Sequence, residues 1–312
     1  MPRKKVSAGK RITSSILSDI RTSNLFNLVS TSFKSWYTNW PQVLLSILTD
    51  LLFVIATSTV ITLIQFTLFE HLEALMKMTG EATGGLMNIY NQTSTVTAGM
   101  NTVTQSADFA YHLNVIFKYL GVLILCSFLF WIIFQGLSWY IAYRMATEKK
   151  KRLPFLVFWK NFALESLPFY FLSIFWIFIS VRITLAMKMS IAPIIGEGTI
   201  NFLFIFFILV TWYFGVLCYT LTSRYAFQNF KQGFIYGTKR FTKTLKSFAF
   251  IAVLFVIIDL FLRLPFIRGD PFLLMVFGTL IFVPALVFSR ILMYRTAQEY
   301  WERKAAPAAK KK

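Results

Sequence analysis

Residues 115–143, which read VIFKYLGVLILCSFLFWIIFQGLSWYIAY, decide the fold class of this chain. The run holds one charged side chain, Lys118, which lies close to its beginning. About 20 mostly apolar residues are enough to cross the hydrocarbon core of a membrane as a helix. The run does not alternate apolar with polar residues as a half-buried strand would, and a helix bonds its own backbone groups in lipid. It therefore predicts a transmembrane helix.

Five more segments have the same character, and the composition of the whole chain agrees with them. These segments are Val43–Phe69, Leu167–Met187, Ile200–Thr222, Phe248–Phe266 and Phe272–Tyr294. The chain is 56% hydrophobic and 14% charged, whereas a soluble domain carries about 25% charged residues. We expect an all-α integral membrane protein with a six-span domain over residues 41–300. A basic N-terminal segment with an interfacial helix (1–40) precedes it, and a basic tail (301–312) follows it.

The net charge of +19 is distributed unevenly between the two ends of the spans. Most of the 32 Lys and Arg residues lie in the N-terminal segment, between spans two and three, between spans four and five, and after span six. Loops rich in Lys and Arg stay in the cytoplasm. We therefore expect a cell-membrane protein with both termini cytoplasmic. Because topology accounts for most of the basic charge, no nucleic-acid partner is expected.

Some of the basic residues are also candidates for binding anionic lipid headgroups, at about 1 kcal/mol each near the membrane surface. These candidates are Lys149, Lys150, Lys151, Arg152, Lys160, Lys239 and Arg240.

The cytoplasmic ends of spans two, four and six resemble one another. Each carries an Arg, then Ala two positions later, then Glu or Gln two positions after that, beginning at Arg144, Arg224 and Arg295. Aromatic and basic residues mix in Phe155–Asn161 and Phe234–Phe241, as in helices that lie in the membrane interface. These features predict three pseudo-repeats, each an interfacial elbow helix followed by a pair of spans. The elbows are either plain connections that guide the chain into the next span or segments that bind lipid or a partner.

The segment from Lys160 to Phe169, a basic and aromatic elbow leading through Leu167-Pro168 into a span, resembles a known family. It is similar to the membrane domain attached to some bacterial and archaeal glycerophosphodiester phosphodiesterases, and to standalone six-span relatives. The resemblance implies the membrane fold. This sequence holds no segment like the soluble phosphodiesterase barrel, so the resemblance does not imply that activity.

Residues 70–112 form the one long connection on the outer side. Apolar or small residues recur there at intervals of three and four, which predicts a helical hairpin that extends spans one and two. Gly80, Gly84 and Gly85 predict a turn before the second part of this hairpin. The many Thr residues leave a partly disordered loop as the alternative. Asn91 begins an Asn-Gln-Thr sequon, which makes it a possible glycosylation site.

Charged side chains inside the spans are the best candidates for structural or functional sites. Asp50 lies about seven residues into span one, or ~10 Å deep at ~1.5 Å per residue. We expect it to pair with Arg144, Arg224 or Arg295; a proton- or cation-binding role for Asp50 is the alternative. Asp259 and Arg263 are one helical turn apart on span five and are expected to pair with each other. Gln135 is an isolated polar residue that could bond across helices or line a path.

Enzyme chemistry finds little support in the sequence. The two histidines, His71 and His112, lack metal-ligand spacing, and the chain has no Gly-rich phosphate loop, no GxSxG and no carboxylate paired with Asp50. We expect no catalytic, cofactor or metal site. Two hypotheses remain: a scaffold or accessory subunit with a membrane-protein partner or a second copy of itself, and a small-solute or ion transporter that uses Asp50.

Overall fold

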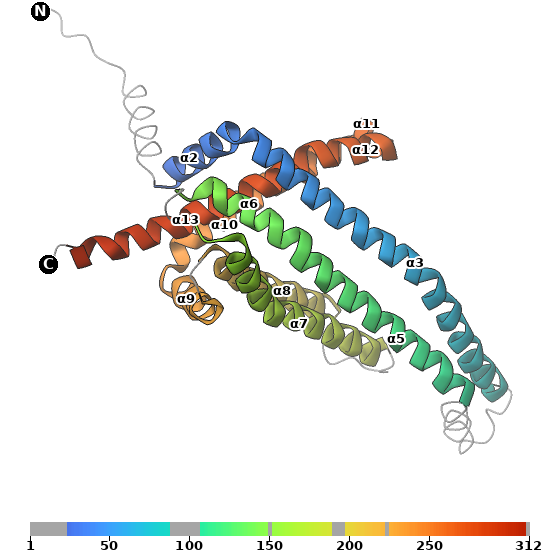
Figure 1. The fold of residues 1–312 in the computed structure, drawn as a ribbon. Helices are drawn as coiled ribbons and strands as arrows, with labels where there is room; N and C mark the ends of the chain where they lie inside the picture. Colours follow the sequence, from blue (N-terminus) through green and yellow to red (C-terminus); the bar gives the residue numbers. More distant parts are fainter. Residues whose placement is uncertain (1–23, 88–106, 149–151, 189–196, 222–224, 310–312) are drawn as a thin grey trace, which may run out of the picture. The chain divides into compact units, whose positions relative to one another are not determined.

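The computed structural model describes residues 24–87, 107–148, 152–188, 197–221 and 225–309. Within these ranges the chain is helical and contains no strand. It divides into two compact units, one made of residues 1–50 and 135–312 and the other of residues 51–134 (Figure 1).

The described residues form a series of helices along the chain. Their bounds are α2 (Asn24–Thr38), α3 (Trp40–Met87), α5 (Ala107–Phe130), a π-helical turn (Trp131–Gln135), α6 (Gly136–Ala146), α7 (Phe155–Lys188), α8 (Glu197–Thr220), α9 (Ala226–Lys239), α10 (Phe241–Leu262), α11 (Pro265–Arg268), α12 (Pro271–Phe277), a second π-helical turn (Gly278–Phe282) and α13 (Val283–Ala309).

Six stretches of the described helices are long and apolar enough to cross a membrane. They are Trp40–Met78, Ala107–Ala146, Phe155–Ser180, Gly198–Thr220, Phe241–Leu262 and Phe272–Gln298. Each of the six spans expected from the sequence overlaps one of them. The chain is thus a multi-pass integral membrane protein, helical throughout its spans.

Helix α13 provides much of the core of the first unit. It contacts α2, α6, α8 and α10. Its fully buried side chains include Val287, Ile291, Leu292 and Tyr294. The second half of span six is therefore enclosed by protein, and the elements around it are positioned by packing against this helix.

The elbow segments take two different forms. Helices α2 and α9 are separate short helices, each followed directly by a span. The sequence predicts a separate middle elbow, and this prediction is wrong. Helix α7 runs without a break from Phe155 through Pro168 into span three. Phe158 and Phe162 are buried in this first part of α7, and this packing holds it helical. Proline is tolerated within transmembrane helices, where neighbouring groups compensate for the missing N–H. The threefold repeat itself stays a prediction.

The second unit contains α3 from Leu51 onward, α5, and the π-helical turn up to Phe134. At about 1.5 Å per residue, the 48 residues of α3 measure roughly 72 Å, against about 30 Å for a hydrocarbon core. The helix continues through Gly80, Gly84 and Gly85, so the turn predicted at these glycines is wrong. A glycine inside a helix costs about 1 kcal/mol, which an established helix can absorb. The remainder of the predicted hairpin, including Asn91, lies outside the described residues.

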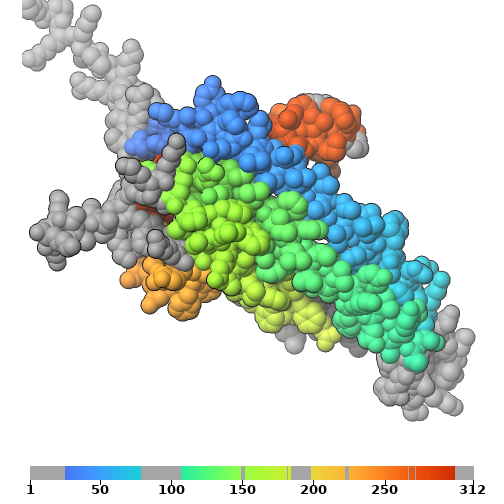
Figure 2. All heavy atoms as spheres, viewed as in Figure 1, coloured from blue at the N-terminus to red at the C-terminus, as the bar shows by residue number. Residues whose placement is uncertain are grey.

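Helices α3 and α5 lie side by side, and side chains fill the space between their ribbons (Figures 1 and 2). Phe53 meets Trp131 in this space, with ring centroids 6.0 Å apart. Large apolar side chains also point outward from both helices, among them Leu63 and Phe66, each 70% exposed. These outward faces are suited to lipid or to another protein.

Candidate functional site at Asp50 and Arg290

Asp50 lies near the beginning of α3, and its side chain is 4% exposed within the first unit. Arg290 of α13 meets it with both terminal nitrogens. Nη1 lies 2.6 Å from Oδ2, and Nη2 lies 3.0 Å from Oδ1. A planar guanidinium forms this bidentate arrangement with a carboxylate. Two residues 240 positions apart thus form a buried ion pair.

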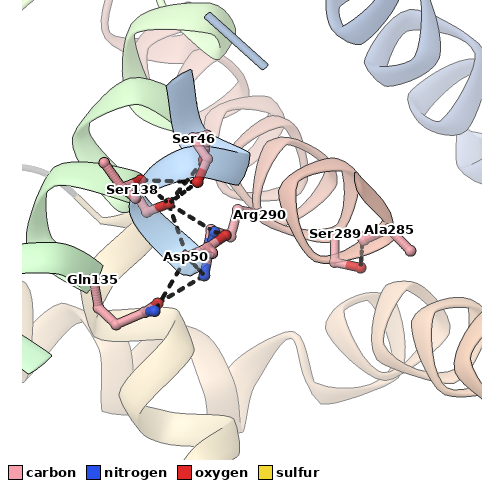
Figure 3. A network of polar contacts seen from close by, with 8 residues as sticks. Ser46, Asp50, Gln135, Ser138, Ala285, Ser289 and Arg290 are labelled. Atoms are coloured by element: carbon pink, nitrogen blue, oxygen red, sulfur yellow. Dashed lines mark hydrogen bonds and ion pairs between the residues drawn. The ribbon is translucent and has the colours of Figure 1, made fainter. Parts of the chain in front are cut away.

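Uncharged side chains from the adjoining spans surround the ion pair (Figure 3). The Gln135 amide donates to Asp50 Oδ1 at 3.1 Å, and its oxygen accepts from Arg290 Nη2 at 2.7 Å. The Ser138 hydroxyl lies 3.0 Å from Asp50 Oδ1 and 3.1 Å from Arg290 Nη1. Ser46 Oγ lies 2.8 Å from Ser138 Oγ. Both charged groups therefore find their partners within the protein.

Helical spacing brings these polar residues onto facing sides of the helices. Ser46, Thr49 and Asp50 stand three and four positions apart on α3, and Gln135 and Ser138 stand three apart on span two. Residues at this spacing share one face of a helix. Thr49 Oγ1 lies 3.0 Å from Ser138 Oγ, which adds a further contact between the two spans. Gln135 is also the last residue of the first π-helical turn, a feature often found at functional sites.

The Arg290 side chain is held by charge, by hydrogen bonds and by an aromatic ring. Besides its hydrogen bonds, the Arg290 guanidinium lies 5.7 Å from the centroid of the Trp139 ring, within the range of a cation–π contact. A buried ion pair adds little net stability compared with apolar packing, but removing one partner costs about 3–5 kcal/mol because the other charge stays buried. The arrangement can fix the relative positions of α3, α6 and α13.

The partner of Asp50 is not one of the three arginines expected from the sequence. Arg144 is exposed and Arg295 is half-buried near the ends of their spans, and Arg224 lies outside the described residues. Arg290 lies inside the predicted span six, Phe272–Tyr294. It lies five positions before Arg295, more than one turn deeper in span six, and this depth matches that of Asp50. Asp50 therefore pairs with an arginine, as predicted, but this arginine is Arg290 and not one of the three expected.

The pair expected on span five is present. Arg263 Nε lies 2.8 Å from Asp259 Oδ2, and both side chains are more than half exposed. Arg263 is the C-cap residue that follows α10. This pair neutralises two charges at the end of the span, and an exposed pair contributes less than about 1 kcal/mol to stability.

The headgroup candidates fall into three groups. Lys149, Lys150 and Lys151 lie outside the described residues. Arg152 donates to the carbonyl oxygens of Thr147 at 3.1 Å and Arg144 at 2.6 Å, so it closes the end of α6. Lys160, Lys239 and Arg240 are exposed, as headgroup binding requires.

A second buried polar pair joins α7 to α9. The Asn229 amide donates to Glu165 Oε1 at 2.5 Å, and both residues are less than 5% exposed. They border a small cavity of about 10 Å³, roughly the space of one water. No Lys or Arg of the described residues forms an ion pair with Glu165. Sequence gives no sign of this burial, because Glu165 lies in the basic and aromatic segment that predicts an interfacial elbow.

Helix α9 approaches α8 closely through Gly233 and Gly237, a pair of small residues four positions apart. A Cβ at Gly233 would lie 2.5 Å from Cys218 Sγ and 3.3 Å from its Cα. A Cβ at Gly237 would lie 2.8 Å from Phe214 and 2.9 Å from Leu217. Small residues at this spacing let two helices approach closely in membrane proteins. The spacing is visible in the sequence and could have predicted this contact.

Comparison with protein-family models, with curated proteins and with solved structures finds no match for this chain.

Proposed function

We propose that this protein is a non-enzymatic membrane scaffold or accessory subunit, which binds a membrane-protein partner and engages anionic lipid at its basic side. The observation that carries this proposal is the closed network around Asp50. Asp50 and Arg290, both buried in the first unit, bond to each other and to Gln135 and Ser138. A scaffold needs such fixed helix positions.

The alternative, a transporter that binds a proton or cation at Asp50, fits this geometry less well. Oδ1 of Asp50 accepts from Gln135, Ser138 and Arg290, and Oδ2 accepts from Arg290. An incoming cation would have to displace the guanidinium and leave it buried without its carboxylate. Separating such a pair costs several kcal/mol.

The outward faces of α3 support a protein partner. Leu63, Phe66 and Phe69 are 67–70% exposed, and they lie in the second unit, where few residues are buried. Lipid could cover these side chains, but helices in membranes also associate through packing of such faces. A partner helix would then bury a surface that this chain leaves open.

The exposed basic residues support the lipid contact. Lys239 and Arg240 stand at the junction of α9 and α10, with Lys243 and Lys246 one and two turns further on, and all four are exposed. Phe227 and Phe234 on α9 are exposed as well. This mixture suits a helix that lies in the interface beside anionic headgroups. The positive-inside distribution supports a cytoplasmic location for this side and for both termini. The resemblance to six-span membrane domains agrees with this proposal.

The proposal is tested by purifying the chain from its source in mild detergent and recording its native mass. We expect a complex of fixed stoichiometry, or a homo-oligomer, that is lost in a Leu63→Asn/Phe66→Asn variant and kept in Asp259→Asn. A monomer whose proteoliposomes accumulate solute, with transport lost in Asp50→Asn, would overturn the scaffold proposal and establish the transporter.

A further inference from the structure

The two histidines of the chain meet in the second unit. His71 on α3 and His112 on α5 are 41 positions apart, yet their Nδ1 atoms are 2.6 Å apart and their ring centroids 4.9 Å apart. The Tyr111 ring stands edge-on to both imidazoles, at 6.0 Å and 5.4 Å. Sequence spacing gave no sign of this pair, because its members lie on different helices.

The spans predicted from the sequence, Val43–Phe69 and residues 115–143, leave both histidines outside the hydrocarbon core. His71 follows the first residue of the predicted span, Val43, by 28 positions, which is about 42 Å along a straight helix. A hydrocarbon core is about 30 Å thick. Both imidazoles are half-buried, so water and small ions have access to them.

Two Nδ1 atoms at this distance must share one proton, because one ring has to donate and the other has to accept. A divalent cation can take the place of that proton, since neutral imidazole is a common metal ligand. Zinc binds imidazole nitrogen at about 2.0–2.1 Å, so two nitrogens at a tetrahedral angle lie about 3.3 Å apart. Opening the present pair to that separation requires a shift of less than about 1 Å, which small side-chain rotations provide.

The surrounding charges favour a cation. Glu70 precedes His71, and Asp108 stands one helical turn before His112 on α5; both are exposed. Glu73 forms an ion pair with Lys77 at 3.1 Å, so the carboxylate of Glu73 balances the positive charge of Lys77. No third His, Cys, Asp or Glu of the described residues completes a protein cage, so water would fill the remaining coordination positions.

We propose that His71 and His112 form a two-histidine binding site for a first-row divalent cation that prefers imidazole, the class of Zn²⁺, Ni²⁺ and Cu²⁺. The bound ion ties α3 to α5 beyond the membrane. This inference goes beyond the scaffold proposal and does not depend on it, because metal binding is measured without any partner.

The test is isothermal titration of the full chain with ZnCl₂ in detergent, using protein purified without a polyhistidine tag. We expect one equivalent of Zn²⁺ to bind and the melting temperature to rise with Zn²⁺ concentration, because a ligand that binds the folded state stabilises it. Loss of outer-shell groups alone weakens metal sites by about 10–100-fold. His71→Ala should therefore weaken binding at least about tenfold.

Two further variants separate metal binding from a structural role of the histidines. His112→Asn keeps a hydrogen-bonding partner for His71 but removes the second imidazole, so we expect a folded protein with the same loss of zinc binding. Glu73→Gln leaves both imidazoles in place and should retain one equivalent. Absence of zinc binding in the wild type, or unchanged binding in folded His112→Asn, would overturn the proposal.

Discussion

Asp50 on α3 and Arg290 on α13 form a bidentate ion pair, with Nη1 2.6 Å from Oδ2, in the interior of the first unit. The pair connects the first and the last span of the chain. Because Gln135 and Ser138 of span two also bond to it, three of the six spans meet at one point. This relationship leads to the first two predictions.

Asp50→Asn should lower the free energy of unfolding by about 3–5 kcal/mol, because it leaves the Arg290 charge buried without a counter-charge. Replacing both residues with apolar ones, as in Asp50→Leu/Arg290→Met, should recover most of that loss. Unfolding in detergent, followed by Trp fluorescence, gives the values. The matched control is Asp259→Asn, whose exposed pair with Arg263 should cost less than about 1 kcal/mol. Equal losses at Asp50 and Asp259 would contradict the structural role of the buried pair.

Ser138→Ala should cost about 1–3 kcal/mol, because the Ser138 hydroxyl contacts Asp50, Arg290 and Ser46 at once. The control is Ser289→Ala on α13. The Ser289 hydroxyl bonds to the carbonyl of Ala285 in its own helix, at 2.7 Å (Figure 3), and its loss should cost less than about 1 kcal/mol. The same unfolding measurement ranks the two variants, and a larger loss for Ser289→Ala would refute the prediction.

Gly233→Ala should destabilise the protein by about 1–3 kcal/mol, because its new methyl group meets backbone atoms of Cys218 as well as the sulfur. The contact between α9 and α8 must then open. Gly121→Ala on α5 serves as the control, since nothing lies within 4 Å of a Cβ there and alanine favours the helix. Limited proteolysis near α9 should increase in the first variant and not in the second. Equal protection in both would show that α9 does not depend on this contact.

Glu165→Gln should leave stability unchanged or raise it, because a buried carboxylate is costly and a glutamine oxygen can still accept from Asn229. Asn229→Ala should lower stability by about 1–3 kcal/mol, since it removes the donor and leaves the carboxylate buried. Melting temperatures of the two variants provide the comparison. A large loss in Glu165→Gln alone would mean that the ionised form is needed.

A Lys239→Gln/Arg240→Gln variant should retain fewer anionic lipids, with a loss of about 1 kcal/mol of binding for each charge removed. Native mass spectrometry of the purified protein counts the retained lipids. Lys77→Gln, which removes a charge from α3 beyond the predicted span, should leave the count unchanged. Equal retention in all three proteins would place the lipid contact elsewhere.

The sequence by itself determined the class of this protein. Long apolar runs specify membrane helices wherever they occur, because backbone groups in lipid must bond within the segment. The six spans could therefore be located without any knowledge of their neighbours. The i, i+4 pair of Asp259 and Arg263 was predictable for the same reason, since its geometry is contained within one helix.

Tertiary structure decided which charges and rings meet. Arg144, Arg295 and Arg290 all lie near one end of a span, and sequence gives their depth to within a turn but not the face that each presents. A helix rotates by about 100° per residue, so a shift of one position moves a side chain off the facing surface. Packing around α13 selected Arg290 for Asp50. In the second unit, the pairing of α3 with α5 brought His71 to His112. The continuous α7 has the same origin, because burial of Phe158 and Phe162 outweighs the local break that Pro168 suggests.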